Sequence, residues 1–528
     1  MPTLFTALQS HLAGRERKRR SIAPALPGVG ALAKTVGPLG ATAAIEALKA
    51  AQQKRARKKP ENPRPKLSLL QRFDPVQRSS TPPHIIVVGA GFAGLSAAYE
   101  LQSVGYKVTV LEAQDDVGGR VKSTRHIVPG RVMERGAELI GKNHLAWWSY
   151  KRIFGLKFEE LRDYKYPSPV ILGGYLLSPA RAEQMAHEMA RGTRLVNNRA
   201  RKVKAYEPWE TTGARRLDNL TLVQGLRRLH IAPLGELAIL EQLQSDNGVE
   251  ASKQSWLGNL AMIKGGGLRR YWTDTETHHC KGGNQRLAHK FKAALHTVDT
   301  GKVVTKIEIR KNGVTVELSR GKPVIGDDVI LAVPPTMWWK HIKFSPNLPR
   351  KYRVHFGNNV KFLLNVDQQA WAPESPEMSS DGPVDMTWQG SDRRDGSRAG
   401  FVAFSGAASA LTCSRWKNRK KKYLDRLSPI YARIKRGCDG SKFENWPKFK
   451  WTRGSYSFPL RGEVMRVGQL MRDGFKGRLH FAGEHTCYAF TGYMEGALRS
   501  GLRVAEQIAR RDRMIRRKKK PKRPHSTK

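Results

Sequence analysis

The stretch His84-Ile85-Ile86-Val87-Val88-Gly89-Ala90-Gly91-Phe92-Ala93-Gly94 decides the fold. Its first five residues form a continuous apolar, β-branched run, which predicts a buried parallel strand. The glycines lead straight into a segment of helical periodicity at 95–105, and a second strand is expected at 107–111. Glycines between a strand and a helix let the backbone approach a pyrophosphate at the positive end of the helix. The stretch therefore predicts an α/β domain that binds a dinucleotide.

An acidic residue follows the second expected strand. Glu112 stands at its end, where a carboxylate can accept hydrogen bonds from a ribose diol. The same carboxylate would repel a 2′-phosphate, so an NADP ribose is disfavoured. The alternative is a glycine-rich turn in an ordinary α/β domain that binds no nucleotide.

The chain is strongly basic. Its 528 residues include 94 Lys and Arg against 45 Asp and Glu, a formal net charge of +49. Residues 1–83 carry a net +12 and residues 510–528 a net +10, which leaves +27 for the presumed globular body. Such a field attracts polyanions and anionic surfaces without specifying a fold. Non-specific association with either is left open as a property of the basic tails.

Composition excludes several classes of protein. None of the four cysteines belongs to a C-x-x-C pair, which argues against a disulfide scaffold and a zinc ribbon. The run His278-His279-Cys280 lacks a fourth ligand at a useful spacing, so no metal is expected. No apolar stretch approaches the roughly 20 residues that span a bilayer, so no transmembrane segment is expected.

Both ends of the chain are expected to be extensions. Residues 1–83 are basic, rich in proline and expected to be largely disordered, with a short helix at 41–53. Arg19-Arg20 opens a mildly apolar run that is similar to a twin-arginine export signal, against the alternative of a plain basic extension. A cytoplasmic location is favoured, with export left open. Residues 510–528 form a basic C-terminal tail.

Further motifs follow the first glycine turn in a specific order. They are Gly118-Gly119-Arg120, Glu134 to Gly141, Gly282 to Leu287, Lys302 to Ile307, Asp328 to Pro335, and Phe481 to Thr486 followed by Gly492 to Ala497. In this order, from about residue 84 to 510, the chain resembles the flavin-containing amine oxidases, which include monoamine, polyamine and L-amino-acid oxidases. The resemblance implies bound FAD.

The resemblance assigns residues to the cofactor. The implied FAD-binding residues are Gly89, Gly91, Phe92, Ala93, Gly94, Glu112, Ala113, Gly119, Arg120, Gly136, Ala137, Val304, Glu484, Gly492, Tyr493 and Met494. Ser455 stands where monoamine oxidases carry the cysteine that bonds to the flavin. A hydroxyl does not readily form that thioether, so non-covalent FAD is expected.

Three residues are implied in catalysis. Tyr456 and Tyr493 match the two aromatic walls that hold an amine before the flavin. Lys361, in the apolar run at 359–363, resembles the lysine that holds a water against flavin N5 and assists reoxidation by O2. The alternative interpretations are core tyrosines and a surface lysine.

The substrate is less well defined. L-amino-acid oxidases commonly carry an arginine for the substrate carboxylate where this chain has Leu139. The neighbouring Glu138 suits a second ammonium group, as in a diamine, polyamine or basic amino acid, or else caps the turn. An amino-acid substrate, bound by an arginine from elsewhere, stays open.

The expected fold is α/β, with a Rossmann-like FAD-binding domain and an interleaved α+β substrate domain. The FAD-binding domain is assigned to 84–142, 275–337 and 452–509, and the substrate domain to 143–274 and 338–451. The expected activity is oxidation of an amine or amino acid, with hydride transfer from the α-carbon to flavin N5, an imine product and reduction of O2 to H2O2. The alternatives are a desaturase or isomerase of the phytoene-desaturase type and a basic flavin-fold protein that binds polyanions. A homodimer is left open.

Overall fold

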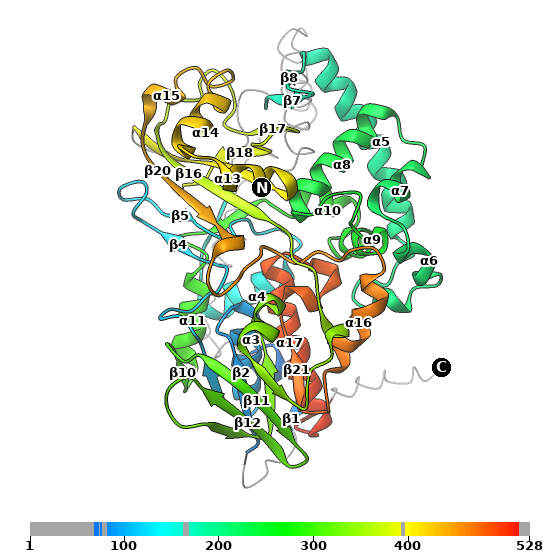
Figure 1. The fold of residues 1–528 in the computed structure, drawn as a ribbon, viewed down its shortest axis with the longest axis vertical. Helices are drawn as coiled ribbons and strands as arrows, with labels where there is room; N and C mark the ends of the chain where they lie inside the picture. The colour runs from blue at the N-terminus through cyan, green and yellow to red at the C-terminus, as the bar shows by residue number, and fades with distance from the viewer. Residues whose placement is uncertain (1–67, 73, 76–81, 162–167, 392–396, 517–528) are drawn as a thin grey trace, which may run out of the picture.

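The computed structural model describes residues 68–72, 74–75, 82–161, 168–391 and 397–516. The helix expected at 41–53, the Arg19-Arg20 signal and the basic residues 517–528 lie outside the described residues. Figure 1 shows two regions, with the first strands and α17 in the lower one. The upper region has a group of helices on one side and a large sheet on the other.

A parallel five-stranded sheet in the order β10-β3-β2-β14-β21 forms the base of the lower region. The strands are β2 (His84–Val88), β3 (Lys107–Leu111), β10 (Val298–Asp299), β14 (Asp328–Leu331) and β21 (Leu479–Phe481). β2 and β3 occupy the expected residues. The helix after them, α3 (Phe92–Ser103), begins three residues earlier than expected, because Gly91 is its N-cap and the glycine turn itself forms the first helical residues.

Both faces of this sheet are covered, as its unbroken apolar strands require. Ile85 and Val87 pack in one core with α3 and α17 (Met494–Arg511), whereas Ile86 and Val88 pack in another with a second sheet. That sheet has the order β13-β12-β11-β15. Its strands are β11 (Val304–Arg310), β12 (Gly313–Leu318), β13 (Val324–Gly326) and β15 (Lys343–Ser345). The other helices of this region are α4 (Leu145–Phe154), α11 (Arg286–Ala294), α12 (Pro335–His341) and α16 (Glu463–Asp473).

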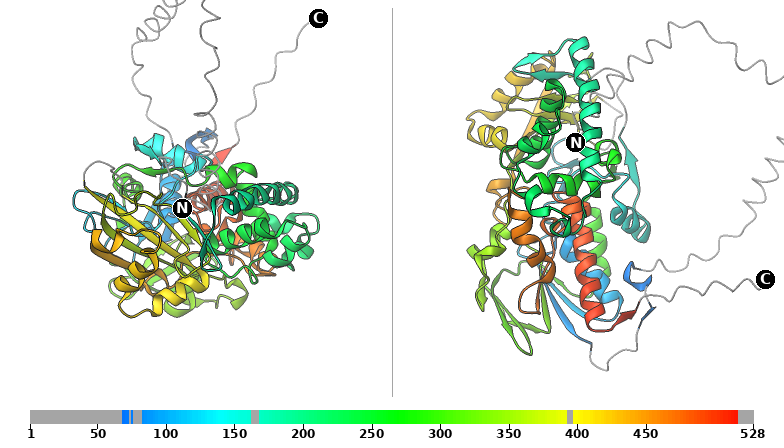
Figure 2. Two further views of the ribbon diagram at one scale, coloured as in Figure 1. Left: turned by 90° about the horizontal axis from the view of Figure 1, so that it is seen from above. Right: turned by 90° about the vertical axis from the view of Figure 1, so that its right-hand side faces the viewer.

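The upper region combines a seven-stranded sheet with a helical group (Figure 2). The sheet, in the order β20-β16-β19-β18-β17-β7-β8, contains β7 (Val170–Leu172), β8 (Tyr175–Leu176), β16 (Asn359–Asp367), β17 (Met378–Ser380), β18 (Met386–Gln389), β19 (Arg398–Gly406) and β20 (Cys438–Asn445). The helical group is α5 (Pro179–Ala200), α6 (Ala214–Asp218), α7 (Leu222–Arg227), α8 (Pro233–Asn247), α9 (Trp256–Gly265) and α10 (Arg269–Asp274). Helices α13 (Ala407–Arg415), α14 (Arg419–Leu427) and α15 (Ile434–Gly437) pack on the sheet. The division of the chain into two domains stays a prediction.

Two short sheets join distant segments. β4 (Ser123–Thr124) pairs with β5 (Met133–Glu134), and β6 (Phe158–Glu160) pairs with β9 (His278–Cys280). None of the helices in the described ranges is both long enough and apolar enough to cross a bilayer.

The folded body reaches further at both ends than the sequence suggested. Leu70 is fully buried beside α3 and α17, and the Leu69 and Leu70 amides donate to the buried Glu100 carboxylate at 3.2 and 2.7 Å. β1 (Asp74–Pro75) pairs antiparallel with β22 (Ile515–Arg516). Parts of both expected extensions therefore belong to the body, because Leu70, Met514 and Ile515 are buried there.

Candidate active site

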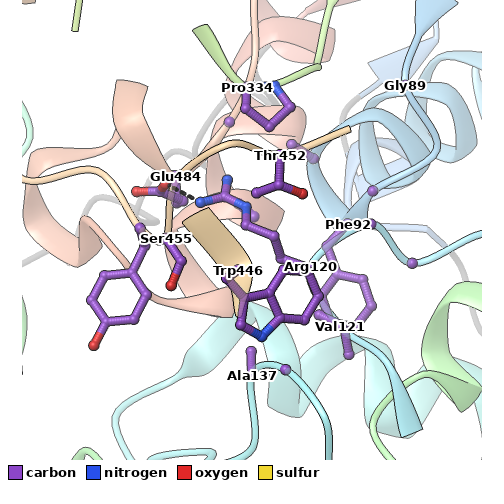
Figure 3. Close-up of a pocket in the computed structure, with 18 of the residues that line it drawn as sticks. Gly89, Phe92, Arg120, Val121, Ala137, Pro334, Trp446, Thr452, Ser455 and Glu484 are labelled. Atoms are coloured by element: carbon purple, nitrogen blue, oxygen red, sulfur yellow. Dashed lines mark hydrogen bonds and ion pairs between the residues drawn. The ribbon is translucent and has the colours of Figure 1, made fainter. Parts of the chain in front are cut away.

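A deep cavity opens at the carboxyl end of β2 and β3, where the two glycine turns meet. It encloses about 1870 Å³ of empty space, its open mouth included. The predicted site residues that line it are Gly89, Gly91, Phe92, Ala93, Glu112, Ala113, Gly119, Arg120, Gly136, Ala137, Glu138, Val304, Lys361, Tyr456, Glu484, Gly492, Tyr493 and Met494. Figure 3 shows several of them converging on the cavity from different elements.

Gly94 is the predicted cofactor residue that the structure places outside the cavity wall. A Cβ built on Gly94 would lie 2.0 Å from the Gly89 carbonyl oxygen and 3.1 Å from Val87 Cγ1. The third glycine of the turn therefore allows α3 to pack closely on β2, which is a structural role.

The first two glycine turns leave space where a pyrophosphate would lie. A Cβ on Gly91 would meet no atom within 4 Å, so this backbone faces open space. Gly119 has φ +61°, and its Cβ would lie 3.3 Å from Gly91 Cα. The Gly118 amide donates to Ala90 O at 2.9 Å and holds the turns together. Two glycine backbones, without side chains, thus lie close together at the N-terminus of α3, where backbone amides favour the binding of an anion.

Glu112 is held firmly at the end of β3. Its carboxylate accepts hydrogen bonds from the Ala90 amide at 2.7 Å and the Gln114 amide at 3.0 Å. Burial raises the pKa of Glu112, and these backbone hydrogen bonds act in the opposite direction. The fixed carboxylate at the cavity wall fits the recognition of a ribose diol.

Arg120 and Glu484 form an ion pair across the cavity, with 2.7 Å between Nη1 and Oε1 (Figure 3). Glu484 also accepts hydrogen bonds from Ser457 Oγ at 2.6 Å and from the Gly492 amide at 2.7 Å. Burial by itself would raise the pKa of Glu484, but Arg120 and the other partners outweigh it and lower that pKa. The pair joins the second glycine turn to the C-terminal motif, and the guanidinium is placed for a phosphate.

Tyr456 and Tyr493 line the cavity together. The Tyr456 hydroxyl donates to the carbonyl oxygen of Asp246, and the Tyr493 ring lies 5.5 Å from the His144 ring, centroid to centroid. A Cβ on Gly492 would lie 2.8 Å from Tyr456 Cδ2, so a glycine is needed for this ring position. Burial raises the pKa of both hydroxyls well above the usual 10, so both stay neutral.

Lys361, on β16, lies beside Glu138 rather than on the surface. Its Nζ is 2.7 Å from Glu138 Oε2, and both side chains are less than a tenth exposed. The other oxygen of Glu138 accepts from Trp388 Nε1 at 3.0 Å, and Lys361 Nζ lies 5.3 Å from the centre of the Trp388 ring. Glu138 was expected either to face a substrate ammonium or to cap its turn, and both of its carboxylate oxygens contact side chains of this chain.

Two further acids line the cavity, and sequence reasoning missed both. Asp246 is the penultimate residue of α8 and is buried, and its carboxylate oxygens have no hydrogen-bond partner among the described residues. Glu276 follows α10 and is partly buried. Burial raises the pKa of each, and repulsion from Glu276 adds to the effect at Asp246. Neither acid belongs to a motif, so only the fold brings them to the site.

A comparison with protein families identifies the family to which this chain belongs. The family described as flavin-containing amine oxidoreductase matches residues 92–509. The chain belongs to this family. FAD is therefore its cofactor, and the protein is an FAD-dependent amine oxidoreductase.

Curated relatives of the amine oxidoreductase include both amine and amino-acid oxidases. Amine oxidase [flavin-containing] B of Sus scrofa is 26% identical over 451 residues, covering 80% of this chain and 85% of the relative. The L-amino-acid oxidase of Vipera ammodytes ammodytes is 24% identical over 475 residues, covering 82% and 94%. Together they support a flavin-dependent amine or amino-acid oxidase in general.

Solved structures share the architecture of the amine oxidoreductase. A double mutant of putrescine oxidase matches with a TM-score of 0.74 at 25% identity, covering 81% of this chain and 99% of that chain. Cyclohexylamine oxidase from Brevibacterium oxydans matches with a TM-score of 0.74 at 20% identity, covering 82% and 100%. The predicted α/β fold with an FAD-binding part and a substrate part is confirmed. The roles of individual site residues stay predictions.

Proposed function

We propose that this amine oxidoreductase is an oxidase that converts a neutral amine to an imine. One observation carries the proposal: Tyr456, Tyr493 and the buried Lys361–Glu138 pair line the same cavity as the dinucleotide-binding turns. FAD, when bound, would supply the two-electron chemistry: it would accept a hydride from the amine α-carbon, and O2 would be reduced to H2O2. Water then hydrolyses the released imine.

The two tyrosines would position the amine. Their rings form apolar walls on which an amine can be held and desolvated. Their raised pKa values keep both hydroxyls protonated, so neither acts as a base at neutral pH. Orientation and exclusion of water are therefore the contributions of Tyr456 and Tyr493.

Lys361 would supply positive charge during the reduction of O2. A cation fixed in a water-poor cavity stabilises the negative charge that develops on oxygen. The 2.7 Å contact with Glu138 fixes the ammonium in place and offsets the cost of burying it. Glu138 is thus a positioning residue for Lys361 in this proposal.

An amine is favoured over an amino acid. Two basic side chains of the cavity wall, Arg120 and Lys361, are each paired with a buried carboxylate. A substrate carboxylate would have to compete with Glu484 or Glu138 for these cations, and would lie near Asp246 as well.

The test is a substrate panel with two measurements. Purified FAD-loaded protein is mixed with monoamines, diamines, polyamines and L-amino acids. We expect anaerobic loss of the visible absorbance of oxidised flavin with amines, and equivalent release of H2O2 in air. Flavin reduction without H2O2 would contradict an oxidase, and a flavin that no amine reduces would contradict amine oxidation altogether.

A further inference from the structure

A second pocket lies beside the FAD-binding cavity and is separate from it. It encloses about 1120 Å³ of empty space, its open mouth included. Phe356 lines this pocket, and the centre of its ring lies 5.5 Å from the guanidinium carbon of Arg120, which lines the cavity. Among the described residues none lines both spaces. The pocket is therefore a candidate site for a ligand other than FAD or the amine.

We call it the basic pocket, because five positively charged side chains line it. They are Lys340, Arg350, Arg353, Arg453 and Arg466, and all five residues are exposed. The first three belong to α12, to the short helical turn η4 (Arg350–Tyr352) and to the residue that follows it. The other two belong to the segment before α16 and to α16 itself. The fold thus brings two distant segments together around one concavity.

Four of these cations have no carboxylate partner. Lys340, Arg350, Arg353 and Arg453 form no ion pair with any described residue. The guanidinium carbon of Arg350 lies 5.2 Å from the centre of the Trp339 ring, and this contact holds the guanidinium at the wall of the pocket. Like charges gathered without counter-charge repel one another, and a bound anion would relieve that repulsion.

The acid that lines the basic pocket is committed to the protein. Glu463 is 3% exposed and accepts hydrogen bonds from the His355 amide at 2.7 Å and the Leu460 amide at 3.1 Å. Arg466, which also donates to backbone carbonyl oxygens, lies 3.8 Å from the same carboxylate. Glu463 therefore offsets the charge of Arg466 at most.

The surroundings of the pocket are positive as well. Burial, together with repulsion from Lys340 and Arg453, lowers the pKa of the neighbouring His341. Arg453 also has a left-handed backbone conformation, with φ +49°, which is uncommon for a residue other than glycine or asparagine. Unusual backbone conformations of this kind occur most often where a side chain is held for a ligand.

We propose that the basic pocket binds a small ligand that carries at least two linked phosphate groups. Four uncompensated cations require several negative charges, and a single carboxylate would offset only one of them. Guanidinium groups form paired, charge-assisted hydrogen bonds with phosphate oxygens. The concave shape favours a small molecule over an extended polymer. Free polyphosphate and the phosphate chain of a nucleotide share this chemistry.

Calorimetric titration of the FAD-loaded full chain tests the inference. Bound FAD occupies the glycine turns of the cavity and keeps the probes out of it, and about 150 mM salt screens diffuse attraction to the basic tails. We expect tripolyphosphate and ATP each to bind at one saturable site per chain, and adenosine not to bind. Tighter binding of ATP would identify a nucleotide as the ligand, and equal affinities would identify the phosphate chain alone. Absence of saturable binding, or adenosine binding as tightly as ATP, would overturn the inference.

Two double variants assign the binding to the basic pocket. Lys340→Gln with Arg353→Gln removes two of its cations, and should weaken the binding of tripolyphosphate by about tenfold or more. Lys343→Gln with Lys351→Gln is the matched control, because it removes two exposed positive charges from the same stretch that do not line the pocket. It should leave the affinity within about twofold of wild type. Equal affinities of the two double variants would show that net charge, and not the pocket, binds the probe.

Flavin content and melting temperature show whether each variant is folded. If the pocket variant does not fold, Arg350→Gln takes its place, with Lys351→Gln as its control. Both double variants should oxidise amines at the wild-type rate, because none of the four substituted residues lines the FAD-binding cavity. Failure of every protein to oxidise amines would contradict the proposed function and leave the phosphate site standing. Unchanged binding in the pocket variant would do the reverse.

Discussion

At the residue scale, the Lys361–Glu138 pair gives the first prediction. Lys361→Met should slow reoxidation by O2 far more than it slows flavin reduction, because the fixed cation is lost. The same change leaves the Glu138 carboxylate buried without its ion-pair partner, which should destabilise the protein by about 3 to 5 kcal/mol. Stopped-flow measurement of the two half-reactions and thermal unfolding check both effects.

A double variant separates the two effects. Lys361→Met with Glu138→Gln removes both charges, and should recover most of the lost stability without recovering the reoxidation rate. Equal slowing of the two half-reactions in Lys361→Met would contradict the role of Lys361 toward O2.

Ser455 gives a second prediction, about the attachment of FAD. Its side chain is buried at the cavity wall, with Oγ 3.5 Å from Asn359 Oδ1, and carries a hydroxyl where a thiol would be needed for a thioether. We expect acid precipitation to release all yellow colour into the supernatant. Ser455→Cys is the matched variant, in which some colour should stay with the pellet. Colour in the wild-type pellet would show that FAD is bound covalently.

Sequence reasoning identified the charged residues that lie in motifs, and missed those that do not. Arg120 and Glu484 belong to ordered motifs, Lys361 lies in the apolar run at 359–363 that resembles a family segment, and all three line the cavity. Asp246 and Glu276 reach the same cavity from the end of α8 and from the turn after α10, and their meeting depends on how helices pack in three dimensions. The partner of Glu138 was missed for the same reason, because Lys361 is far away in the sequence.

At the element scale, the junction between β14 and α17 gives a third prediction. Asp328, at the start of β14, accepts hydrogen bonds from both terminal nitrogens of Arg511 at 2.8 Å and contacts His480 at 2.9 Å. Burial would raise the pKa of Asp328, but these partners outweigh it and lower the pKa to about 2.

The lowered pKa makes this junction a source of stability at neutral pH. The contribution of Asp328 to the free energy of unfolding is complete at pH values above about 4, the pKa of this carboxyl in the unfolded chain. It is lost as the pH falls through about 2, the pKa in the folded protein. Asp328→Asn should therefore lower the free energy of unfolding by about 2 kcal/mol near pH 7 and by much less near pH 2. Chemical denaturation at several pH values measures the difference. Asp473→Asn, at a half-exposed ion pair, is the control and should cost less than about 1 kcal/mol.

The elements that the sequence predicted well are those with local signals. β2 is a run of apolar, β-branched residues that ends at Gly89, β3 is a short apolar run that follows Gly105 and ends at Glu112, and both occupy the expected residues. The predicted start of α3 was three residues too late. Gly91 is the N-cap of the helix, so Gly94, which the motif assigns to the turn, already lies within its first turn. The seven-stranded sheet joins β7 and β8 to strands some 200 residues later, a pairing that no local pattern encodes.

At the scale of the whole molecule, the boundaries of the folded body give a fourth prediction. A chain trimmed to residues 68–516 should keep wild-type flavin content, stability and oxidation of amines. A chain trimmed to 84–509 loses the buried Leu70, two donors to Glu100, the β1–β22 pairing and the Arg511 partner of Asp328, so it should be less stable by about 3 kcal/mol or more. Thermal unfolding and flavin content compare the two. Equal stability would show that the added contacts contribute little.

The short pairing of β1 with β22 brings the two ends of the folded body together. In its register Asp74 lies opposite Arg516, so the segments that precede and follow the folded body are attached at one point of its surface. Those segments, residues 1–67 and 517–528, are both basic. An anionic polymer or surface that bound one of these segments would hold the other segment nearby at a high effective concentration. The two segments would then bind together, with an avidity greater than the affinity of either segment alone.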